Sequence, residues 1–414
     1  MMGLILLARG PSSAAGPPYP LEECFRLALA RSEAVAMREE LVDQAEARVR
    51  QSRAAFLPTL AFGYAYLKQD LPGSSLARSL FPAEQETAKA SAGQSLFRGL
   101  RDLSALRRRR AERGGARWER EQAARRLFED TAAAFYDVLA YEADLANYRA
   151  EIEAHEERRV EVSQLRRLAR ARDADVVAIE SSIASLEAEL AAGGGLLDSS
   201  RETLALLTGL PPESSLAAPE PSPDAPEPLE AWLAGAERRP DVAAARSALE
   251  AAEQEWKAAI GGHLPAADLG FNYYVERPGV SSDVRWDAQV GVSVPLFSGG
   301  LVRAQVAEAA SRVREKELAL GQARRQAESE IRLLYKALSA ALEQAAKLGS
   351  LTELSRRGYE LRLKDSRLGL ATNVDVLQSL AAAHQARRRR DHARLAARQQ
   401  RARLEAVSAR GPLP

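Results

Sequence analysis

Four segments of the chain alternate between large apolar residues and small or polar ones, the period-two pattern of β-strands. They lie at about 59–68, 87–97, 266–276 and 285–297. In the third, Leu269, Phe271 and Tyr273 share one face, while polar or very small residues occupy the other. The second is the weakest, because it is built of small residues and places Gln94 on its apolar face. We therefore expect four short strands.

Long stretches of helix-forming sequence follow each pair of strands. Residues 83–210 and 296–411 contain none of the 20 prolines, and apolar residues such as Leu127, Val138 and Leu145 recur at spacings of three, four or seven. A helix from Leu100 to Leu168 would run on the order of 100 Å at about 1.5 Å per residue. The pattern predicts a mainly α protein of long coiled-coil helices with a small β part.

The two halves of the chain repeat each other. Leu57-Pro58 recurs 207 residues later as Leu264-Pro265, and Leu96-Phe97 recurs 200 residues later as Leu296-Phe297. A constant offset over such a length indicates a duplication. We expect an N-terminal segment at 1–20, a first repeat at 21–210, a proline-rich linker at 211–228, a second repeat at 229–410 and a short tail at 411–414.

One run of glycines interrupts the helix-forming sequence of the first repeat. Three consecutive glycines, Gly193 to Gly195, cost roughly 3 kcal/mol of helix propensity. We therefore predict a helix break there.

Charge and composition exclude several classes of function. The formal net charge is +1, without the basic excess that a nucleic-acid-binding protein requires. The arginine runs 107–110 and 387–390 have acids nearby and are interpreted as solvated helix surface. No cofactor, metal or catalytic motif stands out among the four histidines or elsewhere. We expect no enzymatic activity.

The single cysteine and the N-terminus carry little functional information. Cys24 excludes an intrachain disulfide, and its helical spacing beside Leu21 and Leu27 predicts a small buried side chain. No run reaches 18 apolar residues, so no transmembrane helix is expected. The opening MMGLILLARG lacks a basic region. It is either the remnant of a signal peptide with a misassigned start or a disordered tip.

The strands suit a membrane better than a soluble core. Their length of about ten residues and their one-sided apolar character fit a transmembrane β-barrel, although a half-buried soluble sheet has the same period. Four strands cannot close a barrel, and an open edge in lipid is not permitted. Several chains would then share one barrel, and three chains would supply twelve strands, enough to enclose a passage.

Several motifs together resemble those of the outer-membrane efflux channel family, the TolC-like outer membrane factors. These are SVPLFSGG and SLFRGL at the strand ends, RRPDVAAARSALEAAEQEW after the linker, AAFLPTLAFGYAY, and GLATNVDVLQSLAAAHQA. The resemblance covers about residues 21–410. It implies a homotrimer with a shared twelve-stranded β-barrel in the outer membrane, and an α-helical coiled-coil barrel that projects through the periplasm. It also implies two partners, a periplasmic adaptor protein and an inner-membrane transporter.

The resemblance implies that each long helical region folds back on itself at a tip, near 169–175 in the first repeat and near 369–375 in the second. It places the periplasmic entrance at these two tips. It assigns five residues to the constriction: Asp375, Asp175, Gln378, Arg172 and Asp173. It assigns five more to the tip turns and to adaptor docking: Leu368, Gly369, Leu370, Leu168 and Ala169. Asp375 is alternatively a residue that starts a helix. Some family members carry a second acid where Gln378 stands, and an arginine and a tyrosine at Ala371 and Ser366, so an entrance latched by ion pairs is not expected.

The strand-to-helix junctions form a third set of candidate residues, listed here: Pro295, Phe297, Gly299, Gly300, Phe97 and Gly99. Proline cannot donate to a strand ladder, so Pro295 should lie where pairing ends. Glycine permits the backbone angles of a sharp turn. The first junction lacks the proline and the second glycine, and we predict a smoother bend there.

These features lead to one functional hypothesis and two alternatives. The main hypothesis is a passive outer-membrane exit duct for efflux or type I secretion. The first alternative is a soluble coiled-coil scaffold whose strand segments are incidental. The second is a duct homologue that lost its function with its export signal.

Overall fold

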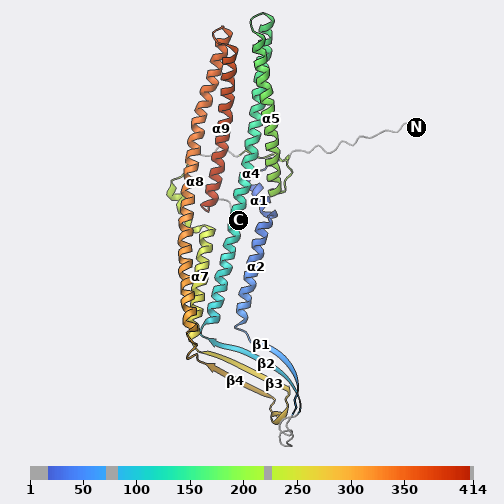
Figure 1. Cartoon of the computed structure of the whole chain (residues 1–414), viewed down its shortest axis with the longest axis vertical. Coiled ribbons are helices and arrows are strands. Elements are labelled where there is room, and N and C mark those ends of the chain that lie inside the picture. Colours follow the sequence, from blue (N-terminus) through green and yellow to red (C-terminus); the bar gives the residue numbers. More distant parts are fainter. Residues whose placement is uncertain (1–16, 71–82, 219–225, 411–414) are drawn as a thin grey trace, which may run out of the picture. The chain divides into compact units, whose positions relative to one another are not determined.

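The computed structural model describes residues 17–70, 83–218 and 226–410 (Figure 1). Helices account for most of them, and one antiparallel sheet accounts for the strands. The structure divides into two compact units. The helical unit comprises Met1–Val35, Glu121–Arg239 and Gln326–Pro414, and the sheet unit comprises Ala36–Arg120 and Pro240–Arg325.

The two repeats show the same order of elements. The first runs through α1 (Leu21–Arg31), α2 (Glu33–Ala54), β1 (Thr59–Lys68), β2 (Glu84–Arg98), α4 (Arg101–Arg167) and α5 (Asp173–Thr208). The second runs through α6 (Leu229–Leu233), η1 (Ala236–Arg238), α7 (Pro240–Ile260), η2 (Gly261–His263), β3 (Ala266–Glu276), η3 (Gly279–Ser281), β4 (Trp286–Ser293), α8 (Leu301–Arg367) and α9 (Asn373–Val407). The helices α4 and α8 both have 67 residues.

The sheet unit holds all four strands in the order β1-β2-β3-β4, each antiparallel to the next (Figure 1). The edge strands are therefore β1 and β4. Strand β4 ends at Ser293 rather than near 297, because Pro295 has no N–H to continue the ladder. Strand β2 begins at Glu84, three residues earlier than expected, where Lys68 of β1 bonds Glu84 at 2.7 Å.

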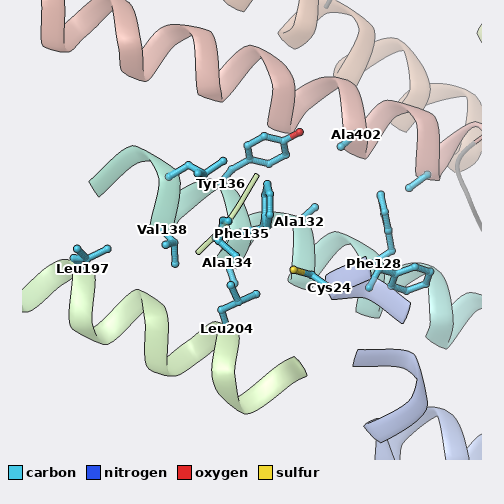
Figure 2. Packing of buried hydrophobic residues seen from close by; sticks show 14 of the residues in the cluster. Cys24, Phe128, Ala132, Ala134, Phe135, Tyr136, Val138, Leu197, Leu204 and Ala402 are labelled. Carbon is cyan, nitrogen blue, oxygen red and sulfur yellow. The ribbon is translucent and has the colours of Figure 1, made fainter. Parts of the chain in front are cut away.

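The main core of the helical unit joins α1 to α4, α5 and α9 (Figure 2). Cys24 and Phe25 of α1 are buried there, and the Phe25 ring meets Phe128 of α4 edge to face at 5.1 Å. Phe135 lies at the centre of the same cluster, fully buried. The prediction that Cys24 is a buried small side chain is confirmed.

The predicted helix break at Gly193–Gly195 is wrong, since α5 runs through it without interruption. The reason is tertiary packing. A side chain at Gly193 would lie 3.0 Å from the Leu145 side chain of α4, so the absent Cβ lets the two helices approach closely. Leu197 and Leu204 then bury their side chains in the core. This burial outweighs a propensity cost of roughly 3 kcal/mol.

Parts of three predicted segments lie outside the described residues: 1–16 of the N-terminal segment, 219–225 of the linker, and the tail 411–414. Backbone hydrogen bonds join the described end of the N-terminal segment to the described start of the linker. Tyr19 donates its N–H to the Ser215 carbonyl and accepts from Ala217, both at 2.9 Å. The start of the linker is thus packed against the start of α1.

Candidate functional site

The two helical tips have the same backbone conformation and hydrogen-bonding pattern. At the second tip, Gly369 is left-handed with φ 76°, its N–H bonds the Ser366 carbonyl at 3.1 Å, and the Leu370 N–H bonds the Asp365 carbonyl at 2.8 Å. This bond pair is the Schellman motif that ends many helices. At the first tip Ala169 takes the place of the glycine and adopts the same left-handed conformation, with φ 52°.

Exposed leucines stand at both turns. Leu168, Leu368 and Leu370 each expose more than two thirds of their surface. Single exposed leucines are common on proteins, but Leu368 and Leu370 flank one turn on both sides of Gly369. The predicted docking residues therefore lie at helix ends, one set at each tip.

Asp375 occupies the third position of α9 and closes a capping box with Thr372. Its carboxylate accepts from the Thr372 hydroxyl at 2.7 Å and from the Thr372 N–H at 2.9 Å. These bonds lower the pKa of Asp375 below its ordinary value. The interpretation of Asp375 as a residue that starts a helix is confirmed. Asp175 is equivalent in α5, where it accepts from the Arg172 N–H at 3.0 Å.

The other predicted constriction residues are accessible. Arg172 is exposed, and Asp173 pairs with Arg166 at 3.2 Å. Gln378 is exposed on the first turns of α9. The structure thus places all five residues at the start of α5 or α9.

A network that the sequence did not reveal ties the two tips together. The buried guanidinium of Arg158 on α4 donates to Asn373 Oδ1 at 3.0 Å and to the Ser366 hydroxyl at 3.1 Å. Asn373 in turn donates to the Asp175 carbonyl at 3.1 Å. Arg158 also pairs with Glu161 at 2.7 Å. One arginine therefore joins both helical hairpins.

At the tips, an ion pair within the chain crosses between the two hairpins. Glu161 of α4, which holds Arg158, also pairs with Arg367 of α8 at 3.4 Å. The residues differ from those that the resemblance indicated, and Ser366 takes part as a hydrogen-bond acceptor instead of a tyrosine. The only signal in the sequence was an arginine at a position of α4 that faces other helices.

Further along α4 and α9, a line of polar residues continues the connection, and we call it the polar seam. Asn147, Glu151 and His155 are buried, whereas His392 is exposed. It comprises Asp144, Asn147, Glu151 and His155 of α4 with His384, Arg388, Asp391 and His392 of α9. Three contacts define it: Asp144 to His392 at 2.6 Å, Asn147 to Asp391 at 3.1 Å, and Glu151 to Arg388.

Burial shifts the ionisation of several seam residues. It raises the pKa of Glu151, which Arg388 partly counters, and it lowers the pKa of His155. Burial, with the positive charges of Arg387 and Arg388, lowers the pKa of His384 to about 4. The pKa of His392 shifts in the opposite direction, because its hydrogen bond to Asp144 raises it. Within the described residues, Nδ1 of His155 and of His384 are buried without a hydrogen-bond partner.

The strand-to-helix junctions have matching geometry in the two repeats. Gly99 and Leu100 have φ values of 60° and 62°, and Gly299 and Gly300 have values of 61° and 85°. The prediction of a smoother bend at the first junction is therefore wrong. The first junction is held by the end of α7, since Gly99 packs so closely on Gly261 that a Cβ at either would lie 2.2 Å from the other's carbonyl oxygen.

The sheet exposes large apolar side chains. Phe62, Ala90 and Tyr273 lie opposite one another across β1, β2 and β3, as do Leu60, Ala92 and Phe271 in the next row. The small residues of β2 leave a hollow of about 370 Å³ between the large ones. Strand β1 is exposed along its whole length and β4 over most of it.

No helix in the ranges that the structure describes combines the length and apolarity needed to cross a membrane. Among the same residues, no group of three or more His, Cys, Asp or Glu side chains is arranged to hold a metal ion.

Solved structures with the same fold are outer-membrane channels. The outer membrane protein VceC of Vibrio cholerae is 19% identical, with 94% of this chain and 96% of that chain covered and a TM-score of 0.79. CusC, a protein that forms a transmembrane channel, is 16% identical over 94% and 91%, with a TM-score of 0.80. The outer-membrane channel OprN is 18% identical over 95% and 91%, also at 0.80. These likenesses establish the fold.

The family is established by the sequence itself. The profile described as outer membrane efflux protein matches residues 25–210 and 235–410, which are the two repeats. No curated protein matches the chain. Such a family assignment places the protein in the outer membrane, with a large periplasmic helical part, and speaks against both an enzyme and a soluble scaffold. The chain belongs to the outer membrane efflux protein family.

Proposed function

We propose that this protein is the exit duct of a tripartite efflux or type I secretion system, and that it works as a homotrimer. The observation that carries the proposal is the sheet. Its four strands leave both edges open and present large apolar side chains to the surroundings. Unpaired edges are not tolerated in lipid. Three copies close twelve strands into one barrel that encloses a passage.

The two tips form the periplasmic entrance in this proposal. Three copies of Asp375 and Asp175 stand around the passage, with Gln378, Arg172 and Asp173 beside them. Because the carboxylate of Asp375 is held by Thr372 and its pKa is lowered, it stays charged at neutral pH. A ring of such charges favours cations.

The partners are a periplasmic adaptor protein and an inner-membrane transporter. The exposed leucines Leu168, Leu368 and Leu370 supply an apolar surface at which an adaptor docks. The left-handed residues Ala169 and Gly369 keep this surface at the helix ends. Leu368→Ser with Leu370→Ser should reduce site-specific cross-linking to the adaptor, without loss of the trimer.

The duct itself is tested by extraction and conductance. Detergent-extracted outer membranes should yield a large species that dissociates on heating, and the purified protein should form channels in planar bilayers. A mostly monomeric or dimeric rod that needs no detergent would contradict the proposal.

Ion selectivity tests the entrance separately. Asp375→Asn keeps one acceptor oxygen for Thr372 and removes the charge, so the reversal potential in a salt gradient should move toward anions. Glu353→Gln, at an exposed acid remote from the tip sequence, is the matched control. An unchanged reversal potential in Asp375→Asn removes Asp375 from the selectivity filter and leaves the duct intact.

A further inference from the structure

We infer that the α2–β1 junction of a second copy of this chain, residues 54–58, covers Leu296 and Phe297, and that β4 pairs with the second copy's β1 so that Val292 faces Tyr64. The inference rests on the proposed homotrimer and adds to it the residues and the register of the contact. It comes from comparing the two repeats with each other.

The first repeat shows what a completed junction looks like. Leu96 and Phe97, at the end of β2, expose 55% and 40% of their surface. The end of α7 lies against this junction, since a Cβ at Gly99 would be 2.2 Å from the Gly261 carbonyl oxygen and 2.9 Å from Leu264 Cβ. The segment that begins at Gly261 therefore covers the first junction.

The second repeat has the same junction without its cover. Leu296 and Phe297 expose 93% and 90% of their surface. A Cβ at Gly299 or Gly300 would meet no atom within 4 Å in the described part of the chain. The backbone nevertheless adopts the same left-handed turn as at Gly99. Two fully exposed large apolar residues beside open space indicate a surface that a partner covers.

The repeat offset identifies the missing cover. Residues 261–265 correspond, 207 positions earlier, to 54–58, which carry the shared Leu-Pro pair. Phe56 and Leu57 are exposed by 46% and 64%. In one chain this segment leads into edge strand β1, whereas Leu296 follows the opposite edge strand β4. A second copy is therefore needed to bring the two together.

The same comparison fixes the register between β4 and the second copy's β1. Within the chain, Ala90 of β2 pairs with Tyr273 of β3, and Ala92 pairs with Phe271. The repeat offset of 200 carries β2 residues onto β4, and the offset of 207 carries β3 residues back onto β1. Applied to these two pairs, the offsets place Val290 opposite Tyr66 and Val292 opposite Tyr64. Both pairs join β-branched and aromatic residues on the apolar face, which stabilises a sheet.

Alternative registers fit the side chains poorly. A slip by one residue would place Val292 opposite Gly63 or Ala65, and would turn one strand's apolar face toward the passage. The transferred register instead keeps all large side chains of β1 and β4 on the same side. The side-chain pattern is independent of the repeat offsets and agrees with the register.

One difference between the repeats affects the fit. Ala54 stands where the second repeat has Gly261. A Cβ at Gly261 would lie 2.2 Å from the Gly99 carbonyl oxygen, so Ala54 cannot approach Gly299 as closely. The junction between copies is therefore wider than the junction within the chain, by about the size of a methyl group.

Cysteine cross-linking tests the register. In a Cys24→Ala background, Val292→Cys with Tyr64→Cys should form disulfides between copies in the outer membrane, seen as dimers and trimers on non-reducing gels. Gly291→Cys with Ala65→Cys tests the neighbouring pair in the same register. Hydrogen-bonded and non-hydrogen-bonded pairs alternate along an antiparallel ladder and differ in Cα separation, so the two cysteine pairs sample both kinds. Val292→Cys with Phe62→Cys is out of register by two residues, too far for a disulfide, and should remain monomeric after denaturation.

The outcomes separate this inference from the proposed function. Cross-linking of the out-of-register pair alone, or of no pair, in a protein that still forms the heat-sensitive trimer would overturn the register and leave the duct standing. Absence of any oligomer in the unsubstituted protein would overturn both.

A second measurement tests the cover itself. Phe297→Ser should lower the temperature at which the trimer dissociates, while the helical content of the dissociated chains is unchanged. Phe97→Ser is the matched control, because Phe97, which is less exposed than Phe297, stands at the junction against which Gly261 of the same chain packs. Equal trimer dissociation temperatures for Phe297→Ser and the unsubstituted protein would overturn the inference.

Discussion

At the scale of single residues, two glycines without neighbouring atoms allow the effect of backbone angle on stability to be measured without an effect of packing. Gly369 and Gly349 both have room for a side chain, since a Cβ at either meets nothing within 4 Å. Gly369 is left-handed, whereas Gly349 lies inside α8. Gly369→Ala should lower the free energy of unfolding by about 1 kcal/mol. Gly349→Ala should raise it by about 1 kcal/mol. Chemical denaturation of both variants would check the opposite signs, and equal signs would contradict them.

Asp375 predicts an acid-sensitive tip. Its carboxyl has a lowered pKa in the folded protein, so its contribution to stability is present above the unfolded value of about 3.9 and is lost as pH falls through the folded pKa. Hydrogen exchange at the start of α9 should therefore rise, relative to the rest of the helix, below about pH 4. Asp375→Asn cannot titrate and should abolish this additional rise. The same rise in that variant would assign it to other groups.

At the scale of elements, Arg158 should control how firmly the two hairpins are held. Arg158→Ala removes its bonds to Asn373 and Ser366 and leaves Glu161 less well paired. We expect a loss of about 2 kcal/mol in unfolding free energy, as for charged hydrogen bonds. Arg159→Ala is the control, because Arg159 leaves 41% of its side-chain surface exposed and, within the described residues, pairs along its own helix with Glu156. Its effect should be below about 0.5 kcal/mol. Thermal unfolding would measure the stability of both variants. Equal losses of unfolding free energy would show that the contacts of Arg158 between the hairpins do not contribute to stability.

The histidines of the polar seam predict two opposite pH dependences. Burial lowers the folded pKa of His384 to about 4, so stability falls as pH drops from about 6.5 toward 4, where only the unfolded chain takes up the proton. The pKa of His392 is raised by Asp144, so its contribution is complete below about pH 6.5 and is lost as pH rises through the folded value. His384→Gln should flatten the acid side of the stability profile, and His392→Gln should lower stability most at acidic pH. Unfolding midpoints at pH 5, 6 and 7.5 would check both, and parallel profiles would contradict the assignment.

The elements also show what the sequence could predict and what it could not. Periodicity, proline-free runs and the repeat offset predicted the strands and the long helices, because these depend on local backbone preference. The resemblance to the efflux channel family placed the tips. The break at Gly193–Gly195 was predicted wrongly because propensity does not include the packing of Gly193 on Leu145. The smooth first junction was predicted wrongly because Leu100 adopts a left-handed φ, which local propensity does not favour for a leucine. Arg158 was missed, since a hydrogen bond across 215 residues leaves no local pattern.

At the scale of the whole molecule, the single cysteine reports on unfolding. Cys24 is fully buried in the core that joins α1, α4, α5 and α9 (Figure 2), and burial raises its pKa to about 11. The thiolate that reacts with alkylating agents is therefore nearly absent at pH 8. Iodoacetamide should leave the folded protein unlabelled and should label it completely in denaturant. Ser350→Cys, on the exposed face of α8, should react at once in the folded protein. Rapid labelling of Cys24 under native conditions would show that this core opens locally.

The polar seam has a consequence for changes in chain length. An inserted residue turns the following part of a helix by about 100° and advances it by about 1.5 Å. One residue added between Asn147 and Glu151 would carry Glu151 away from Arg388 while Asn147 stayed beside Asp391. Only an equal insertion between Arg388 and Asp391 on α9 brings the partners back into step. Helices α4 and α9 can therefore be lengthened or shortened there only together, and an epitope tag or reporter inserted in one of them alone would separate charges that are now paired.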